Sequence, residues 1–324
     1  MNCINYLCSR ILVLQTMKKT ILFLIILAFC QSIYSQTAKY APAWFGPNAN
    51  PVPEFTDARI PAKTTISLMG DYYFGYGDET KNGYIKVEIP LIAERVSFKF
   101  WSTVMENYRV SEELSVKREM NIVDGRITKG DKPFGIKDGY TSGTANGDLY
   151  VQTRISLFKE KKITPAVIFN ATIKTASGTN FPQRRYFDTP GYYFDVEAGK
   201  SIQTKSKFIG EIRAVVNTGF LCWETTNSTQ DDATMYGGKL IIGNPTWKLE
   251  NTLSGYWGWI HTNGRLNPLG DYGDVPLVYA AKFTFLSGYM DYFVQYQYGI
   301  KDFPYHQIRV GISFPVEKLT PKYK

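Results

Sequence analysis

LVYAAKFTFL at residues 277–286, DYFVQYQYGI at 291–300 and QIRVGISF at 307–314 follow one another near the end of the chain. In each segment, aliphatic or aromatic residues alternate with small, amide or charged ones. A period of two places the two sets on opposite faces of a β-sheet. Only short connections separate the three segments, so they predict consecutive antiparallel strands of an all-β protein.

The same alternation continues toward the N-terminus and predicts twelve strands in all. They are expected at 64–75, 83–91, 95–109, 148–158, 164–175, 192–201, 206–221, 235–243, 247–260, 276–286, 289–300 and 306–315. Outside them, only 110–119 shows helical periodicity.

The lengths of the connections alternate as well. The odd-numbered connections tend to be long and rich in Gly, Asn and Asp, and they are expected at 76–82, 110–147, 176–191, 222–234, 261–275 and 301–305. The even-numbered ones have a few residues each, at 92–94, 159–163, 202–205, 244–246 and 287–288. Long outer loops, tight periplasmic turns and an even strand count are typical of an up-and-down transmembrane β-barrel. We therefore expect a single antiparallel barrel of about 12 strands in a bacterial outer membrane.

The polar face of these strands carries charges of both signs, which a barrel would enclose and pair across neighbouring strands. The candidate lumen-lining residues are Lys86, Glu88, Lys99, Arg154, Lys174, Glu197, Glu211, Arg213, Lys248, Glu250, Lys282 and Arg309, together with Lys239. A soluble secreted sheet with a dry core gives the same alternation. The leader, the connection lengths and aromatic residues near strand ends favour the membrane. Those aromatics are Tyr72, Tyr73, Phe74, Trp257, Trp259, Tyr289 and Tyr292.

The N-terminus has the pattern of a cleaved signal peptide over residues 1–35. Lys18 and Lys19 precede ten apolar residues, Ile21–Cys30, which are too few to span a bilayer as a helix. Met17 is the better start. Lipidation at Cys30 is the weaker alternative because the large Phe29 precedes it. Residues 36–62 hold five prolines and predict an extended lead that either hangs in the periplasm or plugs the barrel. The barrel is placed at 63–316, with a tail at 317–324.

Composition excludes several classes of function. The formal charge is +8, and it falls to +5 without residues 1–35, which hold three basic and no acidic side chains. No dense basic run accompanies this weak charge, so no nucleic-acid partner is expected. Cys222 is the one cysteine after the leader, which excludes an intrachain disulfide. No metal-ligand spacing is present, and neither a metal nor another cofactor is expected.

Three expectations concern the outer loops. Arg184, Arg185 and Asp188 either attract anions to the mouth or latch their loop onto the rim. The 110–147 loop folds over the mouth, dips into the lumen as a constriction, or remains a mobile surface loop. His261 opens another long loop, but no triad spacing accompanies it, so an enzyme is not expected.

A resemblance supports this interpretation. The Ser35-Gln36 junction, the Pro-rich lead and the amphipathic last strand ending on Phe314 are similar to outer-membrane barrels of Bacteroidota-type bacteria. The segment 174–195, with KTASG at 174–178 and RYFDTPGYYFD at 185–195, resembles an uncharacterised group of such barrels. The chain departs from them in the residues after Val316, because such barrels usually stop at the aromatic. The resemblance implies fold and location, and no reaction.

Together these features predict a porin-like, narrow channel for small polar or anionic solutes, with outer-membrane lipid as its surroundings. Two alternatives remain open: a non-conducting envelope barrel whose long outer loops bind a partner, and, more remotely, an outer-membrane enzyme at the rim. The oligomeric state and the identity of any solute are left open.

Overall fold

The computed structural model describes residues 42–92, 94–120, 122–123, 126–127, 136–187, 189–223, 232–259 and 275–322. Twelve long strands form the barrel: β1 (Thr65–Phe74), β2 (Asp78–Ile92), β3 (Val96–Ser111), β8 (Leu149–Phe158), β9 (Ala166–Lys174), β10 (Gly191–Gln203), β11 (Glu211–Cys222), β12 (Ala233–Gly243), β13 (Trp247–Gly258), β14 (Leu277–Leu286), β15 (Asp291–Lys301) and β16 (His306–Pro315). The predicted signal peptide and the Met17 start lie outside the described residues.

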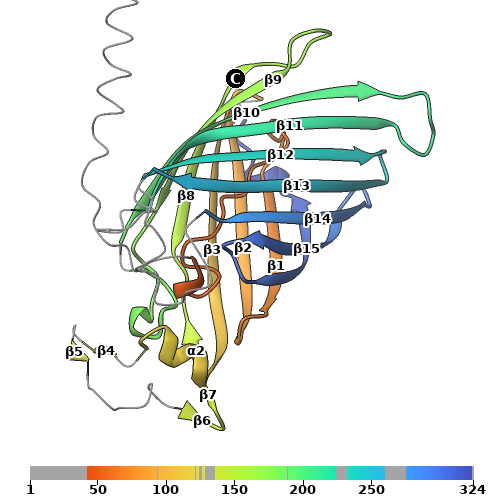
Figure 1. The fold of residues 1–324 in the computed structure, drawn as a ribbon. Coiled ribbons are helices and arrows are strands. Elements are labelled where there is room, and N and C mark those ends of the chain that lie inside the picture. Colours follow the sequence, from red (N-terminus) through yellow and green to blue (C-terminus); the bar gives the residue numbers. More distant parts are fainter. Residues whose placement is uncertain are drawn as a thin grey trace, which may run out of the picture. The chain divides into compact units, whose positions relative to one another are not determined.

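The strands close into a ring. Each pairs antiparallel with its neighbours in the chain, and β1 pairs on one side with β2 and on the other with β16. Figure 1 shows β9 to β15 lying side by side in chain order. Closure leaves no unpaired sheet edge, which is the condition for a sheet in lipid. The predicted twelve-stranded antiparallel barrel is confirmed. Among the described residues, no helix is long and apolar enough to cross a membrane.

The connections sort to two ends of the barrel. The loop end carries 75–77, 112–148, 175–190, 223–232, 259–276 and 302–305; the turn end carries 93–95, 159–165, 204–210, 244–246 and 287–290. One predicted loop, 76–82, is wrong. Gly75, Tyr76 and Gly77 have φ of 96°, 54° and 75°, so the chain reverses within three residues and β2 begins at Asp78. Among the polar residues that suggested a loop, Asp78, Thr80 and Asn82 are buried on the inner face of β2, whereas Glu79 and Lys81 are exposed.

The 112–148 connection has structure of its own. Helix α2 (Glu112–Lys117) begins where Ser111 Oγ accepts a hydrogen bond from the Leu114 amide at 3.3 Å, with acidic residues in its first turn. This agrees with the helical periodicity at 110–119. β7 (Tyr140–Ala145) extends the sheet by pairing with the end of β3 beyond the point where β8 begins. Short strands β4 (Ile122–Val123), β5 (Arg126–Ile127) and β6 (Ile136–Lys137) complete it.

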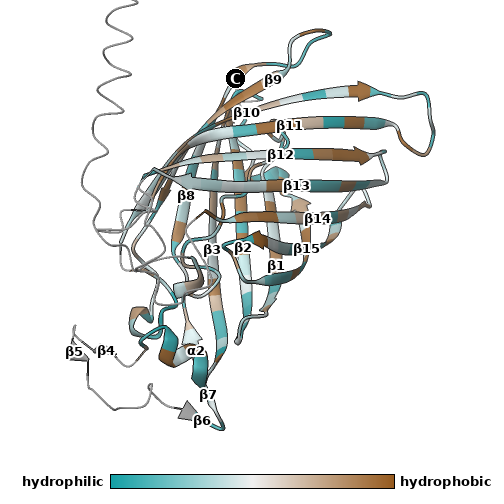
Figure 2. Cartoon of the chain, viewed as in Figure 1, coloured by the Kyte–Doolittle hydropathy of each residue, from teal (hydrophilic) through white to brown (hydrophobic). Residues whose placement is uncertain are grey.

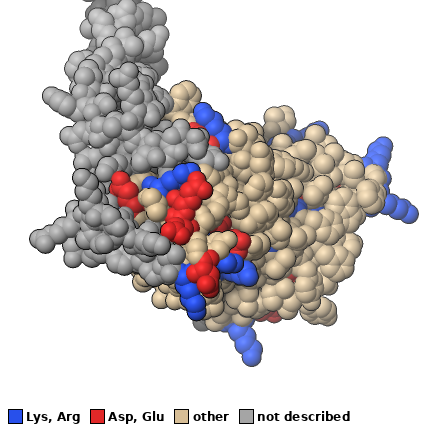
Figure 3. Space-filling model, turned by 60° about the horizontal axis from the view of Figure 1, so that its bottom comes forward, with Lys and Arg blue, Asp and Glu red and all other residues tan. Residues whose placement is uncertain are grey.

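The two faces of the wall differ as predicted. Outward-facing apolar side chains are exposed, as at Val216 (60%) and Val310 (55%), while their inward neighbours Arg213 and Arg309 are at most 4% exposed. Hydrophobic and hydrophilic positions alternate along the strands in Figure 2. In Figure 3 a wide part of the surface carries no charged side chain. The apolar row therefore faces out and the ionic row is enclosed.

One part of the interior departs from the prediction. Toward the loop end, the inward positions carry aromatic and aliphatic side chains, which form a buried cluster around Val52. Tyr73, expected in an outer aromatic belt, is 5% exposed and belongs to this cluster. Parity explains the difference, because Tyr73 shares the inward face of β1 with Asp71, whereas Tyr72 and Phe74 face out. We call this group the aromatic layer; its members are Val52, Tyr73, Tyr150, Tyr193, Leu221, Trp223, Ala233, Met235, Tyr256, Val278, Phe303 and Tyr305.

A lysine placed on either face tests this orientation. Val216 lies at the middle of β11 and faces out, so Val216→Lys should reduce the free energy of unfolding by about 2–4 kcal/mol, because the charge meets hydrocarbon. Gln297→Lys, on the cavity side of β15, should change it by less than about 1 kcal/mol. Urea unfolding of protein refolded in lipid vesicles measures both. Equal losses for the two variants would contradict the orientation.

Candidate functional site: the lumen and the lead that crosses it

The lead, residues 42–62, runs through the barrel from the loop end to the turn end. At the loop end, the Phe45 ring packs against Phe187 at 5.1 Å, and the Gly46 amide donates to the Arg184 carbonyl at 2.7 Å. At the turn end, Arg59 pairs with Glu211, near the start of β11. The lead therefore occupies part of the lumen along its length.

Side chains of the barrel wall form hydrogen bonds with main-chain groups of the lead. Prolines keep this segment extended and out of any sheet ladder, so its buried polar groups need other partners. Glu197 accepts from the Thr56 amide at 2.9 Å and from the Ala58 amide at 3.1 Å. Lys239 Nζ donates to the Phe55 carbonyl, and Arg213 Nε donates to the Asp57 carbonyl, both at 2.7 Å. Charged residues of the wall thus hold the lead through main-chain groups.

A buried ionic cluster fixes the loop end. Arg185 donates to Asp78 at 2.9 Å and to Glu106 at 2.6 Å, and Arg118 reaches the same Asp78 carboxylate at 2.6 Å. All four side chains are fully buried. Burial disfavours the charge of Arg185, but the two carboxylates outweigh burial and raise its pKa. We call these four residues the latch.

The latch also holds the lead, through hydrogen bonds from Arg118. Arg118 donates to the carbonyls of Ala43 at 3.1 Å and Phe45 at 2.9 Å. Arg184, which is 6% exposed, donates to the Arg118 carbonyl at 3.0 Å. Arg184 and Arg185 therefore join loops and lead, and they do not form an open anion-attracting patch. Asp188, the third mouth candidate, lies outside the described residues.

Ion pairs cross the middle of the lumen. Arg309 pairs with Asp71, its cross-strand neighbour, at 2.6 Å, and also with Glu54 of the lead. Lys86 approaches Glu54 from β2 at 3.1 Å. Arg154 pairs with Glu88 at 2.5 Å. Glu54 of the lead thus places a carboxylate between two basic residues of the wall, Lys86 and Arg309.

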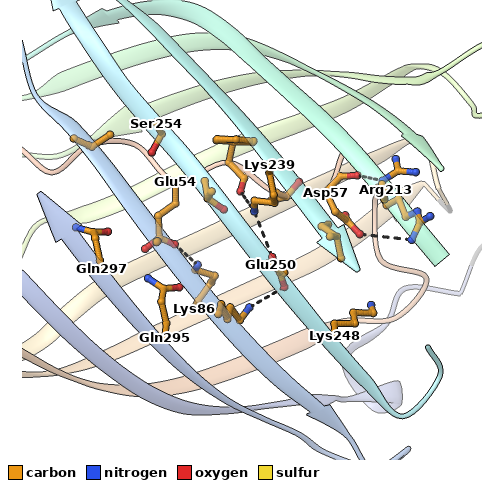
Figure 4. A pocket seen from close by; sticks show the side chains of 18 of the residues that line it. Glu54, Asp57, Lys86, Arg213, Lys239, Lys248, Glu250, Ser254, Gln295 and Gln297 are labelled. Carbon is orange, nitrogen blue, oxygen red and sulfur yellow. Dashed lines mark hydrogen bonds and ion pairs between the residues drawn. The ribbon is translucent and has the colours of Figure 1, made fainter. Parts of the chain in front are cut away.

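The turn half of the lumen holds open space beside the lead. One cavity of about 260 Å³ lies against β11–β15, and an adjoining one of about 250 Å³ shares six of its lining residues. Toward the aromatic layer the free space falls to about 60 Å³. Figure 4 shows Lys86, Lys239, Lys248 and Glu250 around the larger cavity. The two cavities are lined by seven basic residues, Arg59, Lys86, Arg213, Lys239, Lys248, Lys282 and Arg309, and five acidic ones, Glu54, Asp57, Glu211, Glu250 and Asp291.

The structure separates the predicted lumen residues into two groups. Those that line the cavities are Lys86, Glu211, Arg213, Lys248, Glu250, Lys282 and Arg309. Glu88, Arg154, Lys174 and Glu197 lie in ion pairs away from the two cavities; Lys174, for example, pairs with Asp148 at 2.9 Å. Lys99 is buried away from them too, with its ammonium group 4.9 Å from the centre of the Trp101 ring. Sequence reasoning missed Glu54 and Asp57, because it left the location of the lead open. The sequence feature that could have indicated them is the presence of two acidic residues in a segment with few other charges.

The last two expectations concern His261 and metal ligands. His261 lies outside the described residues. Among the residues that the structure describes, no three His, Cys, Asp or Glu side chains are grouped so that they would hold a metal ion.

Removal of one latch charge should be costly. Arg185→Met leaves Asp78 with one basic partner in place of two, and it leaves the buried Glu106 carboxylate without its ion pair. Because an uncompensated buried charge is costly, the free energy of unfolding should fall by about 3–5 kcal/mol. Lys159→Ala is the control, since its ion pair with Glu94 is exposed at the turn end, and it should produce no measurable change. Urea unfolding in vesicles compares the two. A loss for Arg185→Met as small as that of the control would show that the latch does not hold the loop end.

No family model and no curated protein matches the chain. Solved structures with a similar course of the chain include three outer-membrane proteins. An outer-membrane channel from Pseudomonas putida F1 is 10% identical, with a TM-score of 0.49, and the match covers 82% of this chain and 100% of that one. The NanC porin is 10% identical (TM-score 0.46; 78% and 100% covered), and the KdgM porin is 7% identical (TM-score 0.43; 77% and 99% covered). At these identities the likeness concerns the fold alone.

Proposed function

We propose that this protein is an outer-membrane channel for small polar or anionic solutes, narrowed by its own lead. The observation that carries the proposal is the pair of cavities in the turn half of the lumen, enclosed by the barrel and lined by ionised side chains. An enclosed charged space inside a lipid-facing wall suits passage of a hydrophilic solute. The excess of basic over acidic lining residues favours anions.

The location follows from the wall. Exposed valine, leucine, isoleucine and aromatic side chains cover the outside of the strands, and such a surface is stable only against hydrocarbon or another protein. Outer-membrane lipid is thus its main partner. To this we add the expected division of the chain into a signal peptide (1–35), a lead that acts as a plug (36–62), a barrel (63–316) and a tail (317–324). Origin in a Bacteroidota-type bacterium belongs to the same proposal.

The lead and the aromatic layer form the constriction. Val52 belongs to the aromatic layer, so the lead and the wall fill the loop half together. Below it, Glu197 holds the lead at Thr56 and Ala58. Solutes pass when this part of the lead moves away from the wall. The channel is therefore expected to be mostly closed.

The filled loop half also favours a second function. A barrel closed by buried ion pairs needs no conduction, and α2 and β7 between β3 and β8 offer a surface for a partner. This second candidate is a non-conducting envelope barrel. Neither candidate assigns a reaction to the described residues, so the proposal includes no catalytic role.

Conductance separates the two candidates. In planar bilayers the refolded wild-type chain should open rarely. Glu197→Gln removes the charge that holds the Thr56 and Ala58 amides, and hydrogen bonds to a charged group contribute about 1.5–3 kcal/mol. The open probability should therefore rise on the order of tenfold or more.

Glu94→Gln, at the exposed turn end, serves as the matched control and should leave the open probability unchanged. Silence of both the wild type and Glu197→Gln, in protein shown to be folded, would refute the channel and support the non-conducting barrel.

A further inference from the structure

We propose that Lys239, Lys248 and Lys282, grouped around Glu250 in the larger cavity, form a binding site for small carboxylates or other oxyanions with at least two negative charges. The inference deepens the proposed function and rests on its view that solutes enter the lumen. It names where a solute pauses and what chemistry selects it.

Charge is unbalanced at this site. The Nζ atoms of Lys239 and Lys282 each lie 3.5 Å from a different oxygen of Glu250. Charge-assisted hydrogen bonds are about 2.7–2.9 Å long, so one carboxylate stands loosely between two ammonium groups. Lys248, on the same strand as Glu250, has no ion pair within the described part of the chain. These three lysines face two nearby carboxylates, Glu250 and Asp291 of the adjoining cavity, and over both cavities seven basic residues face five acidic ones.

The lysines are held in place from behind. Lys239 Nζ donates to the Phe55 carbonyl at 2.7 Å and lies 5.0 Å from the centre of the Phe55 ring. Lys282 Nζ lies 4.6 Å from the centre of the Phe293 ring. Cation–π contacts fix an ammonium group without neutralising its charge. Two of the three charges are thus positioned before any ligand arrives, which reduces the entropic cost of binding.

The surroundings favour a small hydrophilic ligand. The cavity volume of about 260 Å³ is close to the lower end of the range for small-molecule pockets, about 300–1,000 Å³. Gln295 and Gln297 line the same cavity and add amide donors. Figure 4 shows both glutamines on the side of the cavity away from Lys248. An anion held by the lysines would therefore have neutral donors within the same cavity for its hydroxyl or carbonyl groups.

The residue type indicates the class of ligand. Lysine ammonium groups are compact charges with rotatable donors, whereas a guanidinium imposes a planar two-bond geometry. A site of three lysines selects for total negative charge more than for the shape of one carboxylate. Polycarboxylates should bind best, monocarboxylates weakly, and uncharged polyols not at all.

The open space extends toward the turn end. The adjoining cavity is lined by Ser67, Leu286 and Ser313, which lie at the turn-end limits of β1, β14 and β16. In the other direction, the aromatic layer reduces the free space to about 60 Å³. A solute therefore reaches the lysines from the turn end even when the lead closes the loop half.

Calorimetric titration of the refolded full chain in detergent with citrate tests the site, with glycerol as the uncharged probe. We expect citrate to bind and glycerol not to bind. The paired substitution Lys248→Gln with Lys282→Gln should weaken citrate binding tenfold or more. Glu250→Gln should strengthen it severalfold, since it removes the competing carboxylate. Lys205→Gln, an exposed lysine in a turn at the same end, is the matched control and should have no effect.

The opposite signs for the lysine and glutamate variants guard against misfolding, which would abolish binding in both. Absence of citrate binding to the wild type, or equal weakening by Lys205→Gln, would overturn the site. Conductance of the same preparations separates this inference from the channel. Conductance without citrate binding overturns the site alone, and citrate binding without conductance overturns the channel alone.

Discussion

An ionised side chain enclosed by this barrel needs a partner, and around the two cavities the strands carry six basic residues but three acidic ones. A wall that presents apolar residues to lipid must direct its charges inward, where an unpaired charge is costly. The lead provides what the strands lack. Glu54 pairs with both Lys86 and Arg309, and main-chain carbonyls of the lead accept hydrogen bonds from Lys239 and Arg213. The apolar outer surface, the enclosed charges and the lead inside the barrel thus all follow from the need to pair charges that cannot face lipid.

The degree to which this requirement is met differs between the two halves of the lumen. In the loop half, two arginines share Asp78, Glu106 completes the latch, and aromatic side chains fill the remaining space. In the turn half, seven basic residues and five acidic ones line the open cavities. Full pairing gives rigidity, whereas incomplete pairing leaves charge available to a mobile anion. We therefore infer that the loop half mainly stabilises the barrel and that the turn half interacts with the solute.

Most of the barrel wall could be predicted from the sequence, but few of the contacts inside the lumen could. Period two is a local property, so the strands, their outward faces and the lumen position of Lys248 or Arg309 could be predicted from it. The reversal at Gly75–Gly77 could not, because Asp78 to Asn82 have the composition of a loop. Arg185 lies 107 residues from Asp78, and Glu54 lies 255 residues from Arg309. Such partners become visible only once the ring is closed and the lead is inside it.

The most direct test of this account is a scan of single spin labels along β13, from Lys248 to Trp257, in a Cys222→Ser background in lipid vesicles. Collision with oxygen, which concentrates in hydrocarbon, should be high at 249, 251, 253 and 257 and low at 248, 250, 252, 254 and 256. Collision with a water-soluble nickel reagent should show the opposite period at 248, 250 and 252, beside the cavities. Oxygen access in phase with Lys248 and Glu250, or no period at all, would contradict the lipid-facing wall and the enclosed charges that depend on it.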